Sequence, residues 1–209
     1  MDSRKPGRFL SFEGVDGAGK STLLEALEGP LRARLGSRGL VRTREPGGTP
    51  LGEALRERML SQDMDPLTET LAMFAARREH VVRVLAPALA RGDWLLCDRF
   101  TDASFAYQGG GRGVDPARIA VLADWVQAGT VPDLTVLLDV PPAIAEERRS
   151  RARAADRFEA EPARFFEAVQ AAYLARARAE PSRFLVLPGT APTADSVAAV
   201  LARIAPWLD

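Results

Sequence analysis

The sequence contains few of the residues from which disulfide frameworks, metal centres and histidine-based active sites are built. Among 209 residues there is one cysteine, Cys97, and one histidine, His80, and asparagine is absent. A single cysteine excludes an intrachain disulfide, and we interpret Cys97 as a packing residue. No group of nucleophilic or metal-binding residues surrounds His80, so we expect it to serve on a helix face rather than in catalysis.

An excess of charge of either sign is also missing. The chain has 28 Lys and Arg residues against 28 Asp and Glu residues, which gives a formal net charge of +0 at pH 7. This balance argues against a general nucleic-acid binder, because such domains are usually strongly basic. Only Lys5 and Lys20 are lysines, and every other strong base is arginine.

Long apolar runs are absent as well. The longest, such as Leu134–Val140, have the length of a strand and fall short of the ~18 residues of a membrane-spanning helix. Residues 1–8 are polar and basic, show no secretory signal, and are expected to form a flexible tail. We therefore expect a cytoplasmic protein without a membrane partner.

Apolar periodicity divides the chain into alternating strands and helices. The expected strands are Phe9–Glu13, Leu40–Arg44, Trp94–Cys97, Leu134–Val140 and Phe184–Leu187. The expected helices are Ser21–Leu35, Pro50–Leu60, Pro66–Arg91 with a kink at Pro87, Pro116–Ala128, Pro142 to about Arg151, Ala163–Glu180 and Thr193–Ile204. This alternation predicts an α/β fold in one domain, residues 1–209, with a mostly parallel five-stranded sheet and helices on both faces.

A phosphate-binding loop lies between the first expected strand and helix. The segment Gly14-Val15-Asp16-Gly17-Ala18-Gly19-Lys20-Ser21, followed by Thr22, matches the pattern G-x-x-x-x-G-K-[ST]. Glycines allow backbone N–H groups to surround phosphate oxygens, and the helix N-terminus adds partial positive charge. We expect Lys20 to reach the β- and γ-phosphates of ATP and the Ser21 hydroxyl to bind Mg²⁺.

The loop alone does not name a substrate, because GTPases, helicases, transporters and small-molecule kinases all use it. GTPases usually carry an N-K-x-D motif, which a chain without asparagine cannot contain. Helicases usually carry further motor motifs on a longer chain. The small size therefore favours a nucleotide or metabolite kinase.

Four sequence blocks resemble thymidylate kinase, the bacterial dTMP kinase family. They are Phe12–Thr22, Thr43–Thr49 (TREPGGT), Asp98–Thr101 (DRFT) and Ala106–Gly113 (AYQGGGRG), and the similarity runs from about Phe9 to Leu208. The resemblance implies a three-layer P-loop nucleoside monophosphate kinase fold, phosphorylation of dTMP to dTDP by ATP in dTTP biosynthesis, and a homodimer.

The resemblance also implies where the phosphates are handled. Some relatives place a catalytic arginine directly after Asp16, where this chain has Gly17, so an Arg-rich lid over about 148–160 is expected to supply it. Arg151 and Arg153 are the catalytic candidates, Arg148 is expected against adenine, and Arg157 is expected to support the lid. In the DRFT block, Asp98 is expected to contact Mg²⁺ through water, and Arg99 to clamp both phosphates. Asp16 is expected to contact the sugar or to position donor and acceptor phosphates.

The acceptor site is implied by the same resemblance. Arg44 or Arg56 is expected to hold the monophosphate of dTMP, beside Glu45. Relatives stack thymine on an aromatic residue four positions before an arginine, which allows Phe74 with Arg78 or Met73 with Arg77. We expect Phe74 and Arg77 to contact the base, Ser104 and Gln108 to read its edge, and Tyr107 to select deoxyribose. Close backbone approach is expected at Gly109–Gly113.

Two other functions stay open on the sequence. A kinase for dUMP, CMP or AMP would share the phosphate loop but would not need the TREPGGT and AYQGGGRG blocks. A non-catalytic nucleotide-binding module would keep the fold without needing the full phosphate machinery. The presence of Asp16, Lys20, Ser21, Asp98 and Arg99 argues against this second alternative.

Overall fold

The computed structural model describes residues 7–150, 157–158 and 160–208. The expected catalytic residues Arg151 and Arg153, and most of the expected tail, lie outside the described residues. Across the described ranges, no helix combines the length and the apolar character that a membrane span requires.

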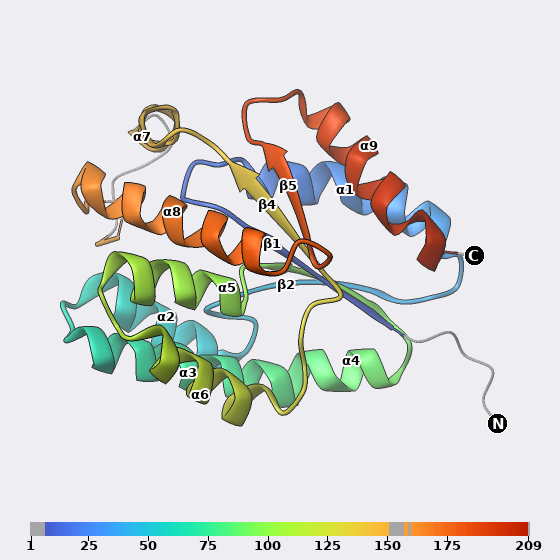
Figure 1. Cartoon of the computed structure of the whole chain (residues 1–209). Helices are drawn as coiled ribbons and strands as arrows, with labels where there is room; N and C mark the ends of the chain where they lie inside the picture. The colour runs from blue at the N-terminus through green and yellow to red at the C-terminus, as the bar shows by residue number, and fades with distance from the viewer. Residues whose placement is uncertain (1–6, 151–156, 159, 209) are drawn as a thin grey trace.

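Within the described residues, five parallel strands form one sheet at the centre of the molecule (Figure 1). They are β1 (Arg8–Glu13), β2 (Leu40–Arg44), β3 (Trp94–Asp98), β4 (Leu134–Asp139) and β5 (Phe184–Pro188). Their order is β2-β3-β1-β4-β5, and every pairing is parallel. The predicted α/β class and five-stranded sheet are confirmed. The chain leaves β1 between the carboxyl ends of β3 and β4, which is where open α/β sheets bind ligands.

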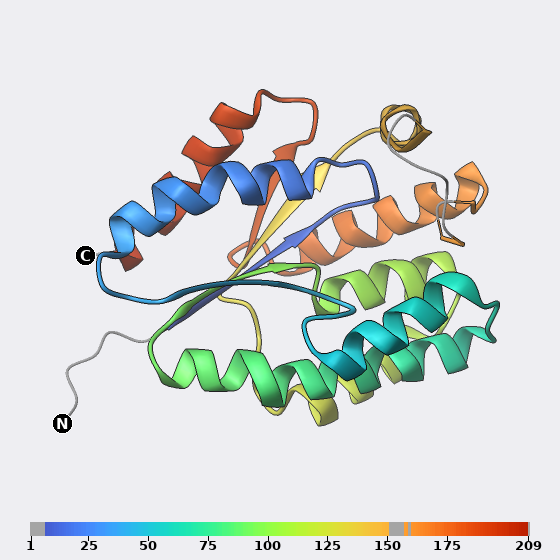
Figure 2. The same ribbon diagram turned by 180° about the vertical axis from the view of Figure 1, so that it is seen from behind.

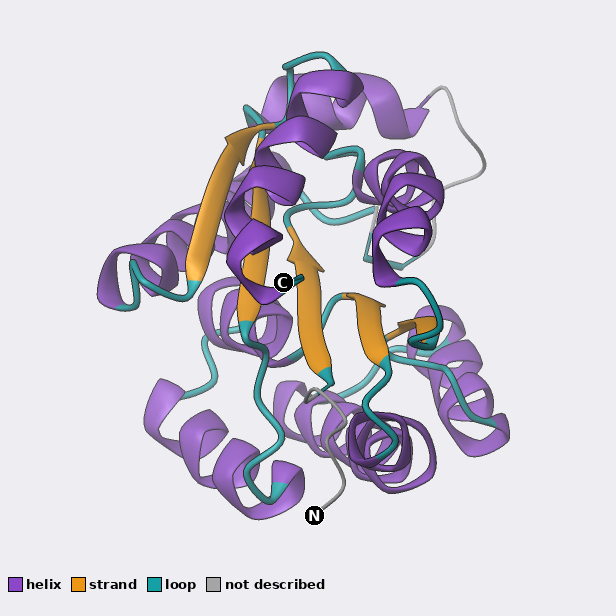
Figure 3. Ribbon diagram, turned by 90° about the vertical axis from the view of Figure 1, so that its right-hand side faces the viewer, coloured by secondary structure: helices purple, strands orange, loops and turns teal. Residues whose placement is uncertain are grey.

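Helices cover both faces of the sheet, as the views from behind and from the side show (Figures 2 and 3). On one face, Leu10 and Phe12 join a core cluster with Leu27 of α1 (Lys20–Leu35). On the other face, Phe9 packs with Val81. This alternation of side chains along β1 is the period of two expected for a strand buried on both faces.

The remaining helical elements connect and flank these layers. They are α2 (Pro50–Ser61), α3 (Pro66–His80), η1 (Val81–Leu85), α4 (Ala86–Ala90), α5 (Thr101–Ser104), η2 (Phe105–Gly111), α6 (Pro116–Gln127), α7 (Pro142–Ser150), α8 (Ala163–Ala179), α9 (Thr193–Ile204) and η3 (Ala205–Trp207).

The expected long helix Pro66–Arg91 is present but changes its winding in the middle. Between α3 and α4 lies a π-helical segment, η1, in which the Ala86 N–H donates to the Val81 carbonyl five residues earlier. Pro87 lacks the N–H that would bond to the Arg83 carbonyl, so the wider turn ahead of it is physically reasonable. The influence of Pro87 therefore takes the form of π-helical winding.

The segment after β3 corrects the sequence analysis, which predicts no helix between Cys97 and Pro116. Here α5 and η2 continue one another and pack against α8. Glycines are poor helix formers and hid this element in the sequence. The expected close backbone approach is found, since a Cβ on Gly110 would lie 2.7 Å from Ala172 Cβ and one on Gly111 2.4 Å from Phe165 Cε2.

Candidate active site

The phosphate loop connects β1 to α1 through backbone conformations that favour glycine. Gly14, Gly17 and Gly19 have φ values of 135°, 84° and 98°. A Cβ on Gly14 would lie 2.5 Å from the Leu138 carbonyl oxygen, so a larger residue would not fit there. The loop therefore presents backbone at the carboxyl end of the sheet, as the sequence predicts.

Lys20 is buried beneath this loop at the start of α1. Its Nζ donates to the carbonyl oxygens of Gly14, at 3.0 Å, and Val15, at 3.1 Å. Burial lowers the pKa of Lys20, and the nearby Arg99 lowers it further, whereas Asp98, Asp16 and Glu13 oppose the shift. A cation in such a poorly solvated position interacts strongly with an incoming polyphosphate.

Arg99 joins the phosphate loop to the end of β3. One guanidinium nitrogen, Nη2, lies 2.6 Å from Asp16 Oδ1, and Nη1 donates to the Gly14 carbonyl at 2.7 Å. The Tyr107 hydroxyl donates to Asp16 Oδ2 at 2.9 Å and accepts from Arg99 Nη2 at 3.1 Å. Burial alone would raise the pKa of Asp16, but Arg99 and Lys20 hold it well below its usual range. Asp16, Arg99 and Tyr107 thus form one charged cluster.

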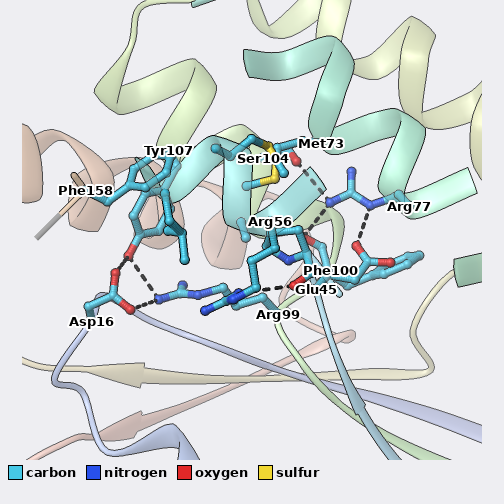
Figure 4. Close-up of a pocket in the computed structure, with 14 residues that line it drawn as sticks. Asp16, Glu45, Arg56, Met73, Arg77, Arg99, Phe100, Ser104, Tyr107 and Phe158 are labelled. Atoms are coloured by element: carbon cyan, nitrogen blue, oxygen red, sulfur yellow. Dashed lines mark hydrogen bonds and ion pairs between the residues drawn. The ribbon is translucent and has the colours of Figure 1, made fainter. Parts of the chain in front are cut away.

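This cluster is one wall of an open cavity of about 680 Å³, which we call the acceptor cavity (Figure 4). Its lining comprises Asp16, Glu45, Pro46, Arg56, Met59, Leu60, Met73, Arg77, Arg99, Phe100, Ala103, Ser104, Tyr107 and Phe158. Seven residues predicted for catalysis or acceptor binding are therefore brought together: Asp16, Glu45, Arg56, Arg77, Arg99, Ser104 and Tyr107.

Arg77 is the buried cation at the far side of this cavity from Asp16. Its Nε donates to Glu45 Oε2 at 2.7 Å, and its Nη2 donates to Ser104 Oγ at 3.0 Å and to the Phe100 carbonyl at 3.1 Å. Nη1 is buried and has no hydrogen-bond partner within the described part of the chain. Arg77 itself lines the cavity, so a ligand there meets a guanidinium that is already oriented by three hydrogen bonds.

His80, the last residue of α3, stands behind this ion pair and is fully buried on the inner face of the helix. Its Nδ1 lies 2.9 Å from Glu45 Oε1, and its Nε2 lies 2.7 Å from Thr43 Oγ1. His80 therefore holds the Glu45 carboxylate that in turn orients Arg77. A lone histidine in a sequence gives no signal for such a supporting position.

Three predicted acceptor residues lie outside the cavity lining. The Phe74 ring is buried beneath the Arg77 guanidinium, 4.6 Å from ring centroid to Cζ, while Met73 lines the cavity. Gln108 is fully buried and donates to Glu69 Oε1 at 2.9 Å. Arg44 is exposed and paired with Glu53 at 2.8 Å. Of the two alternatives left by the sequence, this geometry favours Met73 with Arg77.

Several lining residues escaped the sequence analysis. Phe100 directly follows Arg99, and Phe158 lies next to Arg157, so both stand beside residues that the sequence had singled out. Arg157 donates to Glu69 Oε2 at 2.5 Å and to the Met59 carbonyl at 2.9 Å, and its Cζ lies 4.6 Å from the Phe158 ring centroid. Arg157 thus holds Phe158 against the cavity. Its expected support of the lid concerns residues outside the described ranges and stays a prediction.

A second open cavity, of about 580 Å³, lies on the other side of the phosphate loop, and we call it the donor groove. Its lining comprises Ala18, Gly19, Thr22, Leu23, Leu138, Arg148, Pro188, Gly189, Ala191, Thr193 and Ser196. Arg148 Nη1 donates to the Gly189 carbonyl at 2.8 Å and to the Gly17 carbonyl at 3.4 Å. Arg148 therefore spans from the phosphate loop to the turn after β5.

The residues expected near Mg²⁺ fit an ion held mainly by phosphates and water. Asp98 Oδ1 is buried without a hydrogen-bond partner in the described ranges, and Ser21 is the second residue of α1 and is exposed. Among the same residues, no three His, Cys, Asp or Glu side chains form a cluster able to hold a metal. Mg²⁺ is commonly bound through one or two protein oxygens, its other ligands being water and substrate phosphates.

A parallel sheet, a phosphate loop with its lysine, and a cavity on each side of that loop define a P-loop phosphotransferase. The family model for thymidylate kinase matches residues 12–200. The chain is 58% identical over 186 residues to thymidylate kinase of Burkholderia vietnamiensis, covering 88% of this chain and 90% of the relative. It is 57% identical over 199 residues to that of Thiobacillus denitrificans, covering 95% and 96%.

A solved structure agrees with these relatives. The crystal structure of thymidylate kinase from Ehrlichia chaffeensis superposes with a TM-score of 0.77 at 34% identity, covering 94% of this chain and 99% of that chain. The chain belongs to the thymidylate kinase family, whose members use ATP to phosphorylate dTMP to dTDP.

Proposed function

We propose that this protein is a cytoplasmic dTMP kinase that works by direct in-line transfer with magnesium. The 5′-phosphate oxygen of dTMP attacks the γ-phosphorus of ATP, and the bond from that phosphorus to the β,γ-bridging oxygen breaks, giving dTDP and ADP. The observation that carries the proposal is the position of Arg99. Its guanidinium contacts the phosphate loop at Gly14 and also lines the acceptor cavity, so it lies where the two substrates must meet.

Most of the catalysis then comes from positioning and charge neutralisation. Lys20 and Arg99 offset negative charge on the transferring group, and lid arginines Arg151 and Arg153 are proposed to complete this set. Mg²⁺, bound through Ser21 and through water on Asp98, would neutralise the donor phosphates. Asp16 keeps its negative charge beside Arg99, so it fixes that guanidinium and is available to the acceptor sugar.

The acceptor nucleoside is proposed to lie across the cavity from Tyr107 to Arg77. Arg56, with Arg44 at the rim, would hold the acceptor phosphate. Arg77 Nη1 and Ser104 would meet the base edge, and Met73 would pack on the base with Phe74 supporting Arg77 from behind. The Oε1 of Gln108 is buried and unpaired among the described residues, so Gln108 is kept as a candidate for the same base edge.

The donor nucleoside is proposed to lie in the donor groove. Adenine would rest against Arg148, whose guanidinium is held by two backbone carbonyls. The backbone of residues Gly14–Thr22 would surround the phosphates. A guanidinium fixed at one edge leaves its face available for stacking on a base.

A homodimer is proposed through the outer face of α3 and α6. Large apolar side chains are exposed there, with Leu71 at 50%, Val121 at 68% and Trp125 at 78%. Side chains of this size on one face are typical of subunit interfaces. Sedimentation of the wild type and of Trp125→Glu tests this, since the substitution should yield monomers, and a monomeric wild type would refute the proposal.

A coupled assay of ADP release with Mg-ATP and each nucleoside monophosphate in turn tests the proposed function. Turnover with dTMP far above that with dUMP, CMP, AMP and GMP is expected. A preference for another monophosphate would keep the phosphate chemistry but reject the thymine site. Absence of turnover with every monophosphate, while ATP still binds, would favour a non-catalytic nucleotide-binding module.

A further inference from the structure

Arg99 occupies a backbone conformation that is unusual for a residue with a side chain. Its φ of 69° lies in the left-handed region, where the Cβ of a non-glycine residue is crowded. Such a conformation persists only where the surroundings enforce it. The Arg99 N–H donates to the Phe12 carbonyl at 3.0 Å, so one side of this turn is tied to β1.

The other side of the turn is held by a carboxyl group that the proposed reaction does not use. Glu13, the last residue of β1, accepts a hydrogen bond from the Phe100 N–H through Oε1 at 2.7 Å. The Glu13 side chain is fully buried and does not line the acceptor cavity. The Phe12 carbonyl and the Glu13 carboxyl group, both from the end of β1, therefore accept backbone hydrogen bonds from Arg99 and from the residue after it.

The same carboxyl group is also linked to the Arg99 guanidinium through one tyrosine. Glu13 Oε2 accepts from the Tyr173 hydroxyl at 2.8 Å, and that hydroxyl oxygen accepts from Arg99 Nη1 at 3.1 Å. Tyr173 comes from the middle of α8 and is 1% exposed. Burial raises the pKa of Tyr173 well above its ordinary value, so the hydroxyl keeps the proton that it donates to Glu13.

We propose that Glu13 and Tyr173 are positioning residues for Arg99, which fix its backbone turn and its guanidinium before the substrates bind. Neither side chain lines the acceptor cavity or the donor groove. The proposal rests on the proposed role of Arg99 in phosphoryl transfer. Glu13 and Tyr173 would together hold Arg99 in its strained backbone turn and keep its guanidinium between the two substrates.

A double-mutant cycle with Tyr173→Phe and Arg99→Ala tests this coupling. Tyr173→Phe removes the hydroxyl's bonds to Arg99 and to Glu13. Loss of the bond to the Arg99 guanidinium should lower kcat about tenfold, with KM for ATP and dTMP changed less than about twofold. In the Arg99→Ala background the same change should alter kcat less than about twofold, because the group being positioned is gone. Equal kcat losses in both backgrounds would show that Tyr173 acts through general packing and would overturn the proposal.

Val169→Ala is the matched control, because Val169 is fully buried one helical turn before Tyr173 on α8. It should lower the midpoint of thermal unfolding while leaving kcat unchanged. If Val169→Ala lowers kcat as much as Tyr173→Phe does, disturbance of α8 explains both effects and the proposal is wrong.

Glu13→Gln and Glu13→Ala separate positioning from packing at the second residue. Glutamine keeps a carbonyl oxygen for the Phe100 N–H, so Glu13→Gln should retain more kcat than Glu13→Ala. Ser11→Ala, on the same face of β1 and hydrogen-bonded to Thr135 at 2.9 Å, should keep wild-type kcat. Equal kcat in the two Glu13 variants would overturn the role of this acceptor. If Glu13→Ala does not fold, kcat of Glu13→Gln is compared with that of wild type instead, and wild-type kcat in Glu13→Gln overturns the role.

The activity of Arg99→Ala distinguishes failure of the proposed function from failure of the positioning proposal. If Arg99→Ala keeps wild-type kcat, the proposed role of Arg99 fails, and this inference fails with it. If Arg99→Ala loses activity but Tyr173→Phe and Glu13→Gln match wild type, the function stands and only the positioning proposal is rejected.

Discussion

The acceptor cavity and the donor groove flank the same phosphate loop but are built in different ways. The acceptor cavity is walled by charged side chains that bind one another, such as Asp16 with Arg99 and Glu45 with Arg77. The described part of the donor groove is walled mainly by small or apolar residues, and Arg148 there bonds to backbone carbonyls. The difference suggests that acceptor choice is encoded in side-chain pairs, whereas donor binding relies on the path of the backbone.

The largest effect is expected from breaking a charged pair in the acceptor cavity. Arg77→Ala would leave Glu45 buried without its arginine partner, at a cost of about 3–5 kcal/mol in the free energy of unfolding. Both side chains are nearly inaccessible, at 3% and 4% exposure, so solvent cannot replace the lost partner. Urea unfolding followed by tryptophan fluorescence measures this loss.

Arg78→Ala is the matched control on the same helix. Arg78 is exposed and donates to the Val126 carbonyl at 3.0 Å, so its removal should cost less than about 1 kcal/mol. If both variants lose the same free energy of unfolding, the inference that the buried Glu45–Arg77 pair stabilises the fold is wrong.

A second substitution should impair catalysis without impairing acceptor binding. Lys20→Ala should lower kcat about 10²–10³-fold, since it removes a buried cation from the developing phosphate charge. Affinity for dTMP, measured by calorimetry without ATP, should stay near wild type because Lys20 is absent from the acceptor cavity lining. Arg34→Ala, at an exposed position on α1, controls for loss of helix charge. Loss of dTMP affinity in Lys20→Ala would mean that the two sites are not separable in this way.

The same difference explains what the sequence could and could not predict. The phosphate loop depends on glycines and a lysine at fixed spacing, so Gly14–Ser21 was located from the sequence, together with the order of strands and helices around it. The acceptor cavity depends on which face of a helix meets the site. A rotation of about 100° per residue separates Met73 from Phe74, and periodicity alone did not decide between them.

Supporting residues were harder still to find. Glu13, His80 and Tyr173 are distant in sequence from the groups that they hold, and each resembles an ordinary core or helix residue in the sequence. Glu69 likewise gathers Gln108 and Arg157 in the interior without any motif. Contacts between residues that are far apart in sequence define these positions, so their roles are visible only in the folded structure.

Glu13, at the end of β1, gives an effect that depends on pH. The pKa of Glu13 is raised from 4.5 to about 8, chiefly by burial and then by the nearby Asp102, although Arg99 and the hydrogen bonds from Tyr173 and Phe100 act to lower it. The native state therefore holds more protons than the unfolded state between these pH values. The stability from this group is complete below pH 4.5 and is lost as the pH rises through about 8.

Glu13→Gln should remove this dependence, because glutamine does not titrate. The free energy of unfolding of Glu13→Gln relative to wild type should increase with pH between 4.5 and about 8, by at most about 1.4 kcal/mol per pH unit. Urea unfolding at several pH values measures the slope, and Ser11→Ala should keep the wild-type slope. A parallel slope in Glu13→Gln would contradict the raised pKa.

The smallest effect is expected in the donor groove, where the Arg148 side chain is bonded to backbone carbonyls. Arg148→Ala should raise KM for ATP about two- to fivefold, as expected for loss of an exposed cation–π contact worth about 0.5–1 kcal/mol. Both kcat and KM for dTMP should stay near wild type, because Arg148 is absent from the acceptor cavity lining. Arg164→Ala, at an exposed position on α8, serves as the control. A change in KM for dTMP as large as that for ATP would show that the two regions share determinants, and would remove the distinction between a side-chain-encoded acceptor site and a backbone-encoded donor site.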